Sequence, residues 1–151
     1  ETSDKHRSVR KVFFPSIKHL LGDQINVKIL QVEAIRHRSD VMFYFTGQKQ
    51  VSEINSNDYL PGAVADHLTS TGGKLSGGRQ MSAMDWLKAG VTGSYGTVVE
   101  PCNFTDKFPN PLVMMEHYLA GETLIEAYWK SVKMPGQGVF IGDPLASPYA
   151  D

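Results

Sequence analysis

Runs of apolar residues bounded by turn-forming residues predict the strands of this chain. Residues 41–47 form a continuous apolar run that stops at Gly47, a pattern typical of a strand buried on both faces of a parallel sheet. β-branched or alternating stretches predict four further strands, at residues 26–32, 63–69, 92–99 and 138–142. These stretches alternate along the chain with segments that carry helix signals, so the pattern predicts an α/β fold with a mainly parallel sheet and flanking helices.

Capping signals place the two clearest helices. Ser82 followed by Asp85 three residues later is a capping box, which predicts a short helix that ends before Gly90. Asn110 and Pro111 predict the start of the longest helix, extending to about residue 132 with a kink at Gly121. A helical turn is predicted at residues 16–21, closed by Gly22 and Asp23.

The apolar pattern also predicts which residues form the core and which lie outside it. The predicted core consists of Val41, Phe43, Phe45, Val64, Val98, Leu119, Ile125, Trp129, Val139 and Ile141. Residues 5–11 are too polar for the core and are expected to form a frayed or docked terminus, and residues 12–14 are expected to be extended before Pro15. We expect residues 1–151 to form one α/β domain, with residues 1–25 as a peripheral docking segment.

Composition and charge exclude several classes of function. The chain has 151 residues, of which 41% are hydrophobic and 21% charged, with a net charge of −1, so overall charge gives it no reason to bind nucleic acid. No apolar run reaches the length needed to cross a membrane. Residues 1–40 carry eight basic and five acidic residues, a local excess of +3 that favours docking on an acidic partner or is simply a solvated basic surface.

The candidate catalytic residues follow two predicted strands. His67 ends the strand before the Gly-rich loop, and Cys102, the only cysteine, follows the next strand. If those strands are neighbours, the imidazole could take the thiol proton and stabilise a thiolate nucleophile, while Glu100 or Asp66 orients the ring. The alternative is that Cys102 fills space in the core and that His67 is a structural hydrogen-bonding residue.

No cofactor or metal site is predicted. The residues around Gly73 and Lys74 lack the first glycine and the Ser/Thr of a phosphate-binding loop, since Leu75 follows the lysine. The histidines are scattered, with no pair at the spacing that ligates a metal on a helix.

Three long blocks of sequence carry a family resemblance. These blocks are residues 61–70, residues 93–103 and residues 118–132 with the following 142–145. They resemble an uncharacterised bacterial family that is associated with the exosortase protein-sorting system, over roughly residues 40–149. Family members are longer at the N-terminus, so the resemblance implies that this chain is the C-terminal portion of a longer protein. It also implies a bacterial protein with an exported or cell-envelope location.

A more distant resemblance concerns the fold. Gly142, Asp143 and Pro144 after a strand are similar to the end of gingipain-type peptidases, which implies a caspase-like layering, with a flavodoxin-like one as the alternative. Those peptidases place a histidine and a cysteine on adjacent strands, but their histidine is followed by glycine, whereas Leu68 follows His67 here. The same alignment places Cys102 one strand too late.

Two functions therefore remain open from the sequence. The first is a non-catalytic binding or assembly module whose partner is a second copy of the chain or the remainder of its parent protein. The second is a cysteine peptidase or acyl transferase that uses Cys102 and His67. A sheet edge or face left bare near residues 1–35 would be the surface through which the chain associates.

Overall fold

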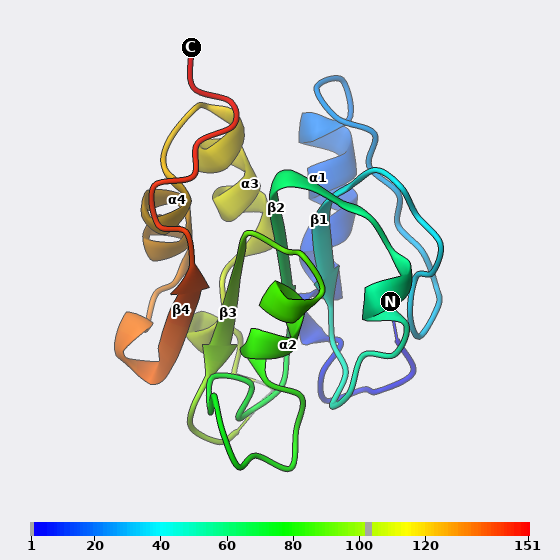
Figure 1. Ribbon diagram of the computed structural model, residues 1–151, viewed down its shortest axis with the longest axis vertical. Coiled ribbons are helices and arrows are strands. Elements are labelled where there is room, and N and C mark those ends of the chain that lie inside the picture. The colour runs from blue at the N-terminus through cyan, green and yellow to red at the C-terminus, as the bar shows by residue number, and fades with distance from the viewer. Residues whose placement is uncertain (1, 102–103) are drawn as a thin grey trace.

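The sheet contains four strands in the order β1-β2-β3-β4, in a computed structural model that describes residues 2–101 and 104–151. The strands are β1 (Val41–Thr46), β2 (Tyr59–His67), β3 (Gly93–Thr97) and β4 (Gly138–Gly142). The first three are parallel, and β4 runs antiparallel to β3. The predicted α/β class with a mainly parallel sheet is therefore confirmed, and β1 and β4 form the two edges (Figure 1).

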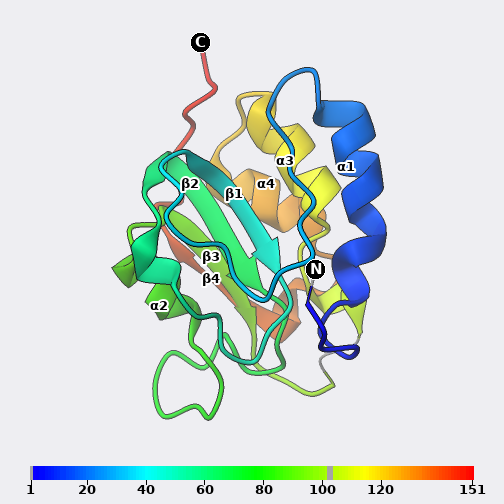
Figure 2. The ribbon, with the colours of Figure 1, turned by 90° about the vertical axis from the view of Figure 1, so that its right-hand side faces the viewer.

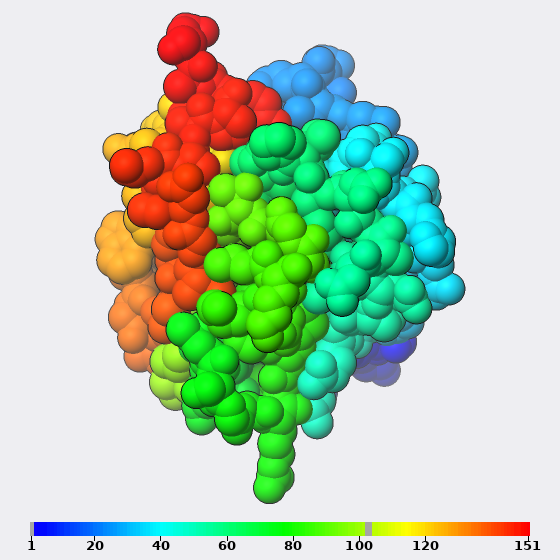
Figure 3. All heavy atoms as spheres, viewed as in Figure 1, coloured from blue at the N-terminus to red at the C-terminus, as the bar shows by residue number. Residues whose placement is uncertain are grey.

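Helices cover both faces of this sheet. One face packs against α1 (Phe14–Leu21), α3 (Pro111–Leu119) and α4 (Leu124–Ser131), as Figure 2 shows. The other face is covered by α2 (Ala83–Lys88) and by residues 48–58, which include the 3-10 helix η2 (Ile54–Ser56). Figure 3 looks onto this second face, and Figure 1 shows the loop of residues 71–80 projecting below it.

The two faces form two separate cores because successive side chains of a strand point to opposite sides. Val64 of β2 packs with the helices α1, α3 and α4, whereas the next residue, Ala65, packs with Trp86 of α2. Both β2 residues are completely buried. This alternation fixes the direction in which the polar residues at the end of β2 point.

The predicted caps are confirmed. The Ser82 side chain accepts a hydrogen bond from the Met84 backbone N–H, and the Asp85 side chain completes the capping box. Asn110 caps α3 in the same way through the Leu112 N–H. Beyond Leu119 the predicted long helix is broken into α3 and α4, since Gly121 adopts a φ of +86°, which ends a right-handed helix.

This break explains one error in the predicted core. Trp129 is 55% exposed, because α4 begins again at Leu124 and presents Leu124, Ala127 and Tyr128 to the interior instead. Of the other predicted core residues, Val41 and Val64 are buried. The remaining ones are half-buried: Phe43, Phe45, Val98, Leu119, Ile125, Val139 and Ile141.

Two predictions for the N-terminal part are wrong. Residues 26–32 do not form a strand, because they lie beside β1 without entering its hydrogen-bonding ladder. Residues 12–14 are helical rather than extended. Val12 and Phe13 belong to the 3-10 helix η1 (Val9–Phe13), and α1 begins at Phe14, so packing of Phe14 against the core outweighs the steric preference of a residue before proline.

Candidate functional site

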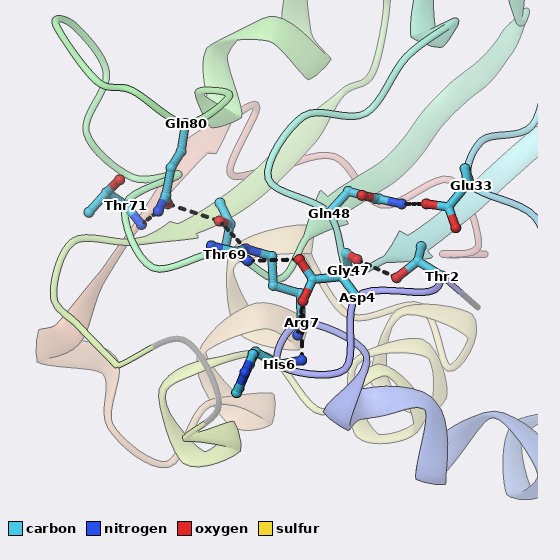
Figure 4. Close-up of polar contacts among 10 residues, drawn as sticks. All are labelled: Thr2, Asp4, His6, Arg7, Glu33, Gly47, Gln48, Thr69, Thr71 and Gln80. Atoms are coloured by element: carbon cyan, nitrogen blue, oxygen red, sulfur yellow. Dashed lines mark hydrogen bonds and ion pairs between the residues drawn. The ribbon is translucent and has the colours of Figure 1, made fainter.

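The carboxyl ends of β1 and β2 lie at the same end of the sheet, where open α/β sheets bind their ligands. We call this end of the sheet the carboxyl edge. Residues 2–10, which we call the strap, lie across it. The Thr2 hydroxyl donates a hydrogen bond of 2.6 Å to the Gly47 carbonyl oxygen at the end of β1 (Figure 4). The strap backbone is so close that a Cβ atom at Gly47 would overlap the Arg7 carbonyl oxygen. The carboxyl edge is therefore covered by the chain itself.

A chain of hydrogen bonds joins the strap to the loop after β2. Arg7 Nε donates to Thr69 Oγ1 over 3.0 Å, and this hydroxyl donates in turn to Gln80 Oε1 over 2.9 Å. The same Gln80 oxygen accepts from the Thr71 backbone N–H at 2.7 Å (Figure 4). Within the strap, Arg7 also pairs with Asp4, with 2.7 Å between nitrogen and oxygen. These contacts fix the strap over the edge at its partly exposed end.

The buried end of the strap is Arg10, which the sequence placed outside the core. That expectation is wrong for this residue: Arg10 is only 2% exposed and forms an ion pair of 2.5 Å with Asp66 of β2. It also donates to the Thr46 carbonyl oxygen at 3.1 Å. Burial raises the pKa of Asp66, and the charge and hydrogen bond of Arg10 oppose that rise. A buried ion pair thus connects the strap to the second strand.

Helical spacing is the signal that could have located Arg10. Arg10, Phe14, Ile17 and Leu21 are separated by four, three and four residues, the spacing of one face of a helix. Ile17 and Leu21 are buried on this face. Because η1 leads directly into α1, Arg10 lies on the same inward side.

His67 lies on the opposite face of the sheet from Asp66, because the two residues are adjacent in β2. Its Nδ1 accepts a hydrogen bond of 2.9 Å from Trp86 Nε1, so its Nε2 carries the proton and donates to the Met81 carbonyl oxygen at 3.0 Å. Burial lowers the pKa of His67 to about 4, which keeps the ring neutral at pH 7. Both ring nitrogens therefore form hydrogen bonds, one with Trp86 of α2 and one with Met81 just before this helix.

Of the other two predicted catalytic residues, only Glu100 lies within the described part of the chain. Glu100 is exposed beyond the end of β3, and the partners of the imidazole are Trp86 and Met81 rather than a carboxylate. Cys102 lies outside the described residues, so the pairing of Cys102 with His67 stays a prediction. Within the described part of the chain, no three His, Cys, Asp or Glu side chains gather closely enough to hold a metal ion.

A second candidate site is an apolar slot of about 460 Å³ along the edge of β1. All six residues of β1 line it, and residues 25–30 form much of the facing wall. Since successive residues of a strand point to opposite faces, a cavity that contacts all six runs along the strand edge. Sequence reasoning identified both walls as strand-like but could not show that a gap separates them.

Comparisons of this chain with protein-family models, with curated proteins and with solved structures found no match. The resemblance to the exosortase-associated family therefore stays a prediction from the sequence. Among the helices that the structure describes, none has both the length and the apolar character needed to span a bilayer.

Proposed function

We propose that this chain is a non-catalytic binding or assembly module that receives an extended segment of a partner polypeptide at the edge of β1. The observation that carries the proposal is the slot, which follows the whole length of an edge strand. Addition of a strand to a sheet edge is a common mode of peptide recognition, in which backbone hydrogen bonds supply affinity and side-chain pockets supply specificity.

The backbone of β1 supports this mode of binding. The Thr46 carbonyl oxygen accepts from the Leu68 N–H, so the polar groups of Thr46 point toward β2. Because these groups alternate along a strand, the N–H and C=O of Phe43 and Phe45 point the other way, toward the slot. Among the described residues other than Leu30, no backbone hydrogen bond joins residues 25–32 to β1. An incoming strand would find donors and acceptors at that edge.

The side chains around the slot indicate the chemistry of the occupant. Val32 and Leu60 line the slot and are 44% and 41% exposed, which favours a segment with apolar side chains. The charged residues in the lining are Lys28, Arg38 and Asp40, a net positive set. We therefore infer an apolar partner segment that carries an acidic residue beside its apolar stretch.

The catalytic alternative receives less support from the site. A general base must offer a free lone pair within hydrogen-bonding reach of the proton that it removes. The Nδ1 lone pair of His67 already accepts from Trp86, and the ring is buried beneath α2. Removal of a thiol proton by Nδ1 of His67 would first require the hydrogen bond from Trp86 to break.

The proposal is compatible with the family resemblance and with the fold layering that the sequence predicts. The family resemblance supports a role beside the exosortase system, with the remainder of the parent protein as the partner that supplies the strand. Helices on both faces of a mainly parallel sheet support caspase-like or flavodoxin-like layering.

Amide hydrogen exchange with a defined peptide tests the proposal. The probe is a synthetic peptide with the sequence of residues 25–33, which has apolar residues at five of its nine positions and ends in Glu33. In the free chain, the amides of Phe43 and Phe45 should exchange faster than that of Tyr44, which points toward β2. Saturating peptide should slow both. Equal protection of all three amides in the free chain, or no slowing by the peptide, would overturn the proposal.

Matched variants of peptide and protein locate the binding. A peptide with Ile29→Pro loses an N–H and cannot continue a ladder, so it should not bind. In the protein, Val32→Asp should abolish binding because Val32 lines the slot. Val12→Asp is the control, since Val12 is 66% exposed and lies outside the slot lining. Equal loss of binding in both protein variants would contradict binding at the slot.

A further inference from the structure

The guanidinium group of Arg10 lies in a pocket that contains every element of arginine recognition. The Asp66 carboxylate supplies the counter-charge at 2.5 Å. The carbonyl oxygens of Thr46 and Pro109 accept hydrogen bonds of 3.1 and 3.4 Å. The rings of Phe45 and Phe108 lie 5.7 and 5.8 Å from the guanidinium carbon, within the range of cation–π attraction. The pocket is built from β1, β2 and the turns that precede α3.

Arg10 does not use all that this pocket offers. Only one Asp66 oxygen, Oδ1, is bonded to Arg10, and the buried Oδ2 has no hydrogen-bonding partner in the structure. The Nε of Arg10 is also buried without a partner. Arginine binds a carboxylate most strongly through two parallel N–H···O bonds. An arginine that enters at a different angle would satisfy both Asp66 oxygens, which Arg10 leaves half-satisfied.

The other polar contacts of the strap that the structure describes are more exposed. The Arg7–Asp4 pair lies within the strap, and both side chains are partly exposed. Single hydrogen bonds join Thr2 to Gly47 and Arg7 to Thr69, and Val9 packs against Leu68 and Phe108. Partly exposed polar contacts contribute little to stability. The ion pair of Arg10 with Asp66 is by contrast fully buried, and it anchors the strap to the sheet.

We propose that the carboxyl edge of β1 and β2 contains an arginine-binding pocket, and that Arg10 occupies it as an intramolecular ligand. The ligand class is the arginine side chain of another polypeptide, which replaces Arg10 and displaces the strap. This proposal is independent of the slot at β1, because the Asp66 carboxylate that carries it and the Phe108 ring do not line the slot. It gives the covered edge of the sheet a binding function that begins when the strap is displaced.

The first test creates the empty pocket in the full chain. Arg10→Ala should lower the melting temperature, and methylguanidinium at millimolar concentration should restore part of the loss in a saturable way. Methylammonium at equal ionic strength should not, because it lacks the planar fork. Arg10→Lys is the matched variant: its pocket stays filled, so methylguanidinium should not stabilise it. Equal effects of the two cations on Arg10→Ala would overturn the proposal.

The second test uses the unmodified chain and does not depend on a variant that folds. N-acetyl-arginine amide should accelerate amide exchange across residues 4–10 by about tenfold at a concentration about ten times its Kd for the open pocket, because mass action favours the displaced strap. N-acetyl-lysine amide is the control and should have no effect. If the arginine probe leaves this exchange unchanged, Arg10 is a fixed structural contact and the proposal is wrong, even where methylguanidinium stabilises Arg10→Ala.

Discussion

His67 should make the stability of this protein fall steeply in mild acid. The ring is almost completely buried, accepts from Trp86 and donates to Met81, so the folded state requires the neutral imidazole. Protonation at Nδ1 would replace the acceptor of the Trp86 N–H with a second N–H. The folded protein therefore resists a proton that the unfolded chain takes up freely.

The magnitude follows from the two pKa values of this ring. Burial lowers the pKa of His67 from 6.5 to about 4 in the folded state. Because the unfolded state binds the proton at higher pH, the contribution of the neutral ring is complete above pH 6.5 and declines as the pH falls toward 4. A pKa difference of this size corresponds to about 3 kcal/mol in the free energy of unfolding. That is a large fraction of the stability of a domain of this length.

Urea unfolding at a series of pH values between 4 and 8 measures this effect, with tryptophan fluorescence as the signal. His67→Asn removes the titrating group, so its stability should depend less on pH by about 3 kcal/mol across this range, whatever its absolute stability. His19→Asn replaces an exposed histidine and should retain the steep slope of the parent chain. Equal slopes for the parent chain and His67→Asn would show that the ring is accessible or already protonated in the folded state.

Two further substitutions test the strap and the core. Gly47→Ala should displace the strap, because the new methyl group overlaps the Arg7 carbonyl oxygen. Amide exchange over residues 2–10 should then rise while β2 stays protected. Gly136→Ala is the control: a methyl group at this position has no neighbouring atom within 4 Å, so the exchange should stay unchanged. Leu124→Ala should lower the free energy of unfolding by about 2–5 kcal/mol, since Leu124 of α4 is fully buried in the core that α1, α3 and α4 form with the sheet. Leu145→Ala, at a residue 75% exposed, should change it by less than about 0.5 kcal/mol. Denaturant unfolding distinguishes the last pair, and equal losses would contradict the assignment of the core.

The elements that the sequence predicted correctly depend on neighbouring residues. The capping box at Ser82 and Asp85 and the start of α3 at Asn110 are complete within four residues. The apolar run of β1 likewise predicts, without reference to any distant residue, a strand that is covered on both faces. Residues 26–32 show the limit of such signals, because a strand exists only where another backbone accepts its hydrogen bonds. Alternation of side chains cannot reveal whether that backbone is in reach.

The site shows the same limit over a longer distance. The carboxyl ends of the strands could be located from the sequence, and polar residues do gather there. The partner of Asp66, however, lies 56 residues away in a segment whose polar composition predicted a frayed or docked terminus outside the core. Two relations were open to prediction. Asp66 and His67 are adjacent in a strand and must face opposite sides, so Asp66 could not orient the imidazole. The helical spacing of Arg10 with Ile17 and Leu21 indicates the inward side, although nothing in the sequence identifies Asp66 as the partner of Arg10.

Two segments of the first 40 residues, the strap and residues 25–32, meet the sheet in physically different ways, and this difference determines how each segment can be exchanged. The strap is anchored by a buried charge, so its release exposes Asp66 and is favourable only when another cation of matching shape replaces Arg10. Residues 25–32 contact β1 through apolar side chains across a slot and form no strand ladder with it, so an incoming strand displaces side-chain contacts rather than a ladder. Binding at the slot therefore requires only an extended apolar chain, whereas binding at the carboxyl edge requires an arginine. A single partner segment that carries both features could engage the two sites in succession, because β1 connects the slot along its edge to the pocket at its carboxyl end.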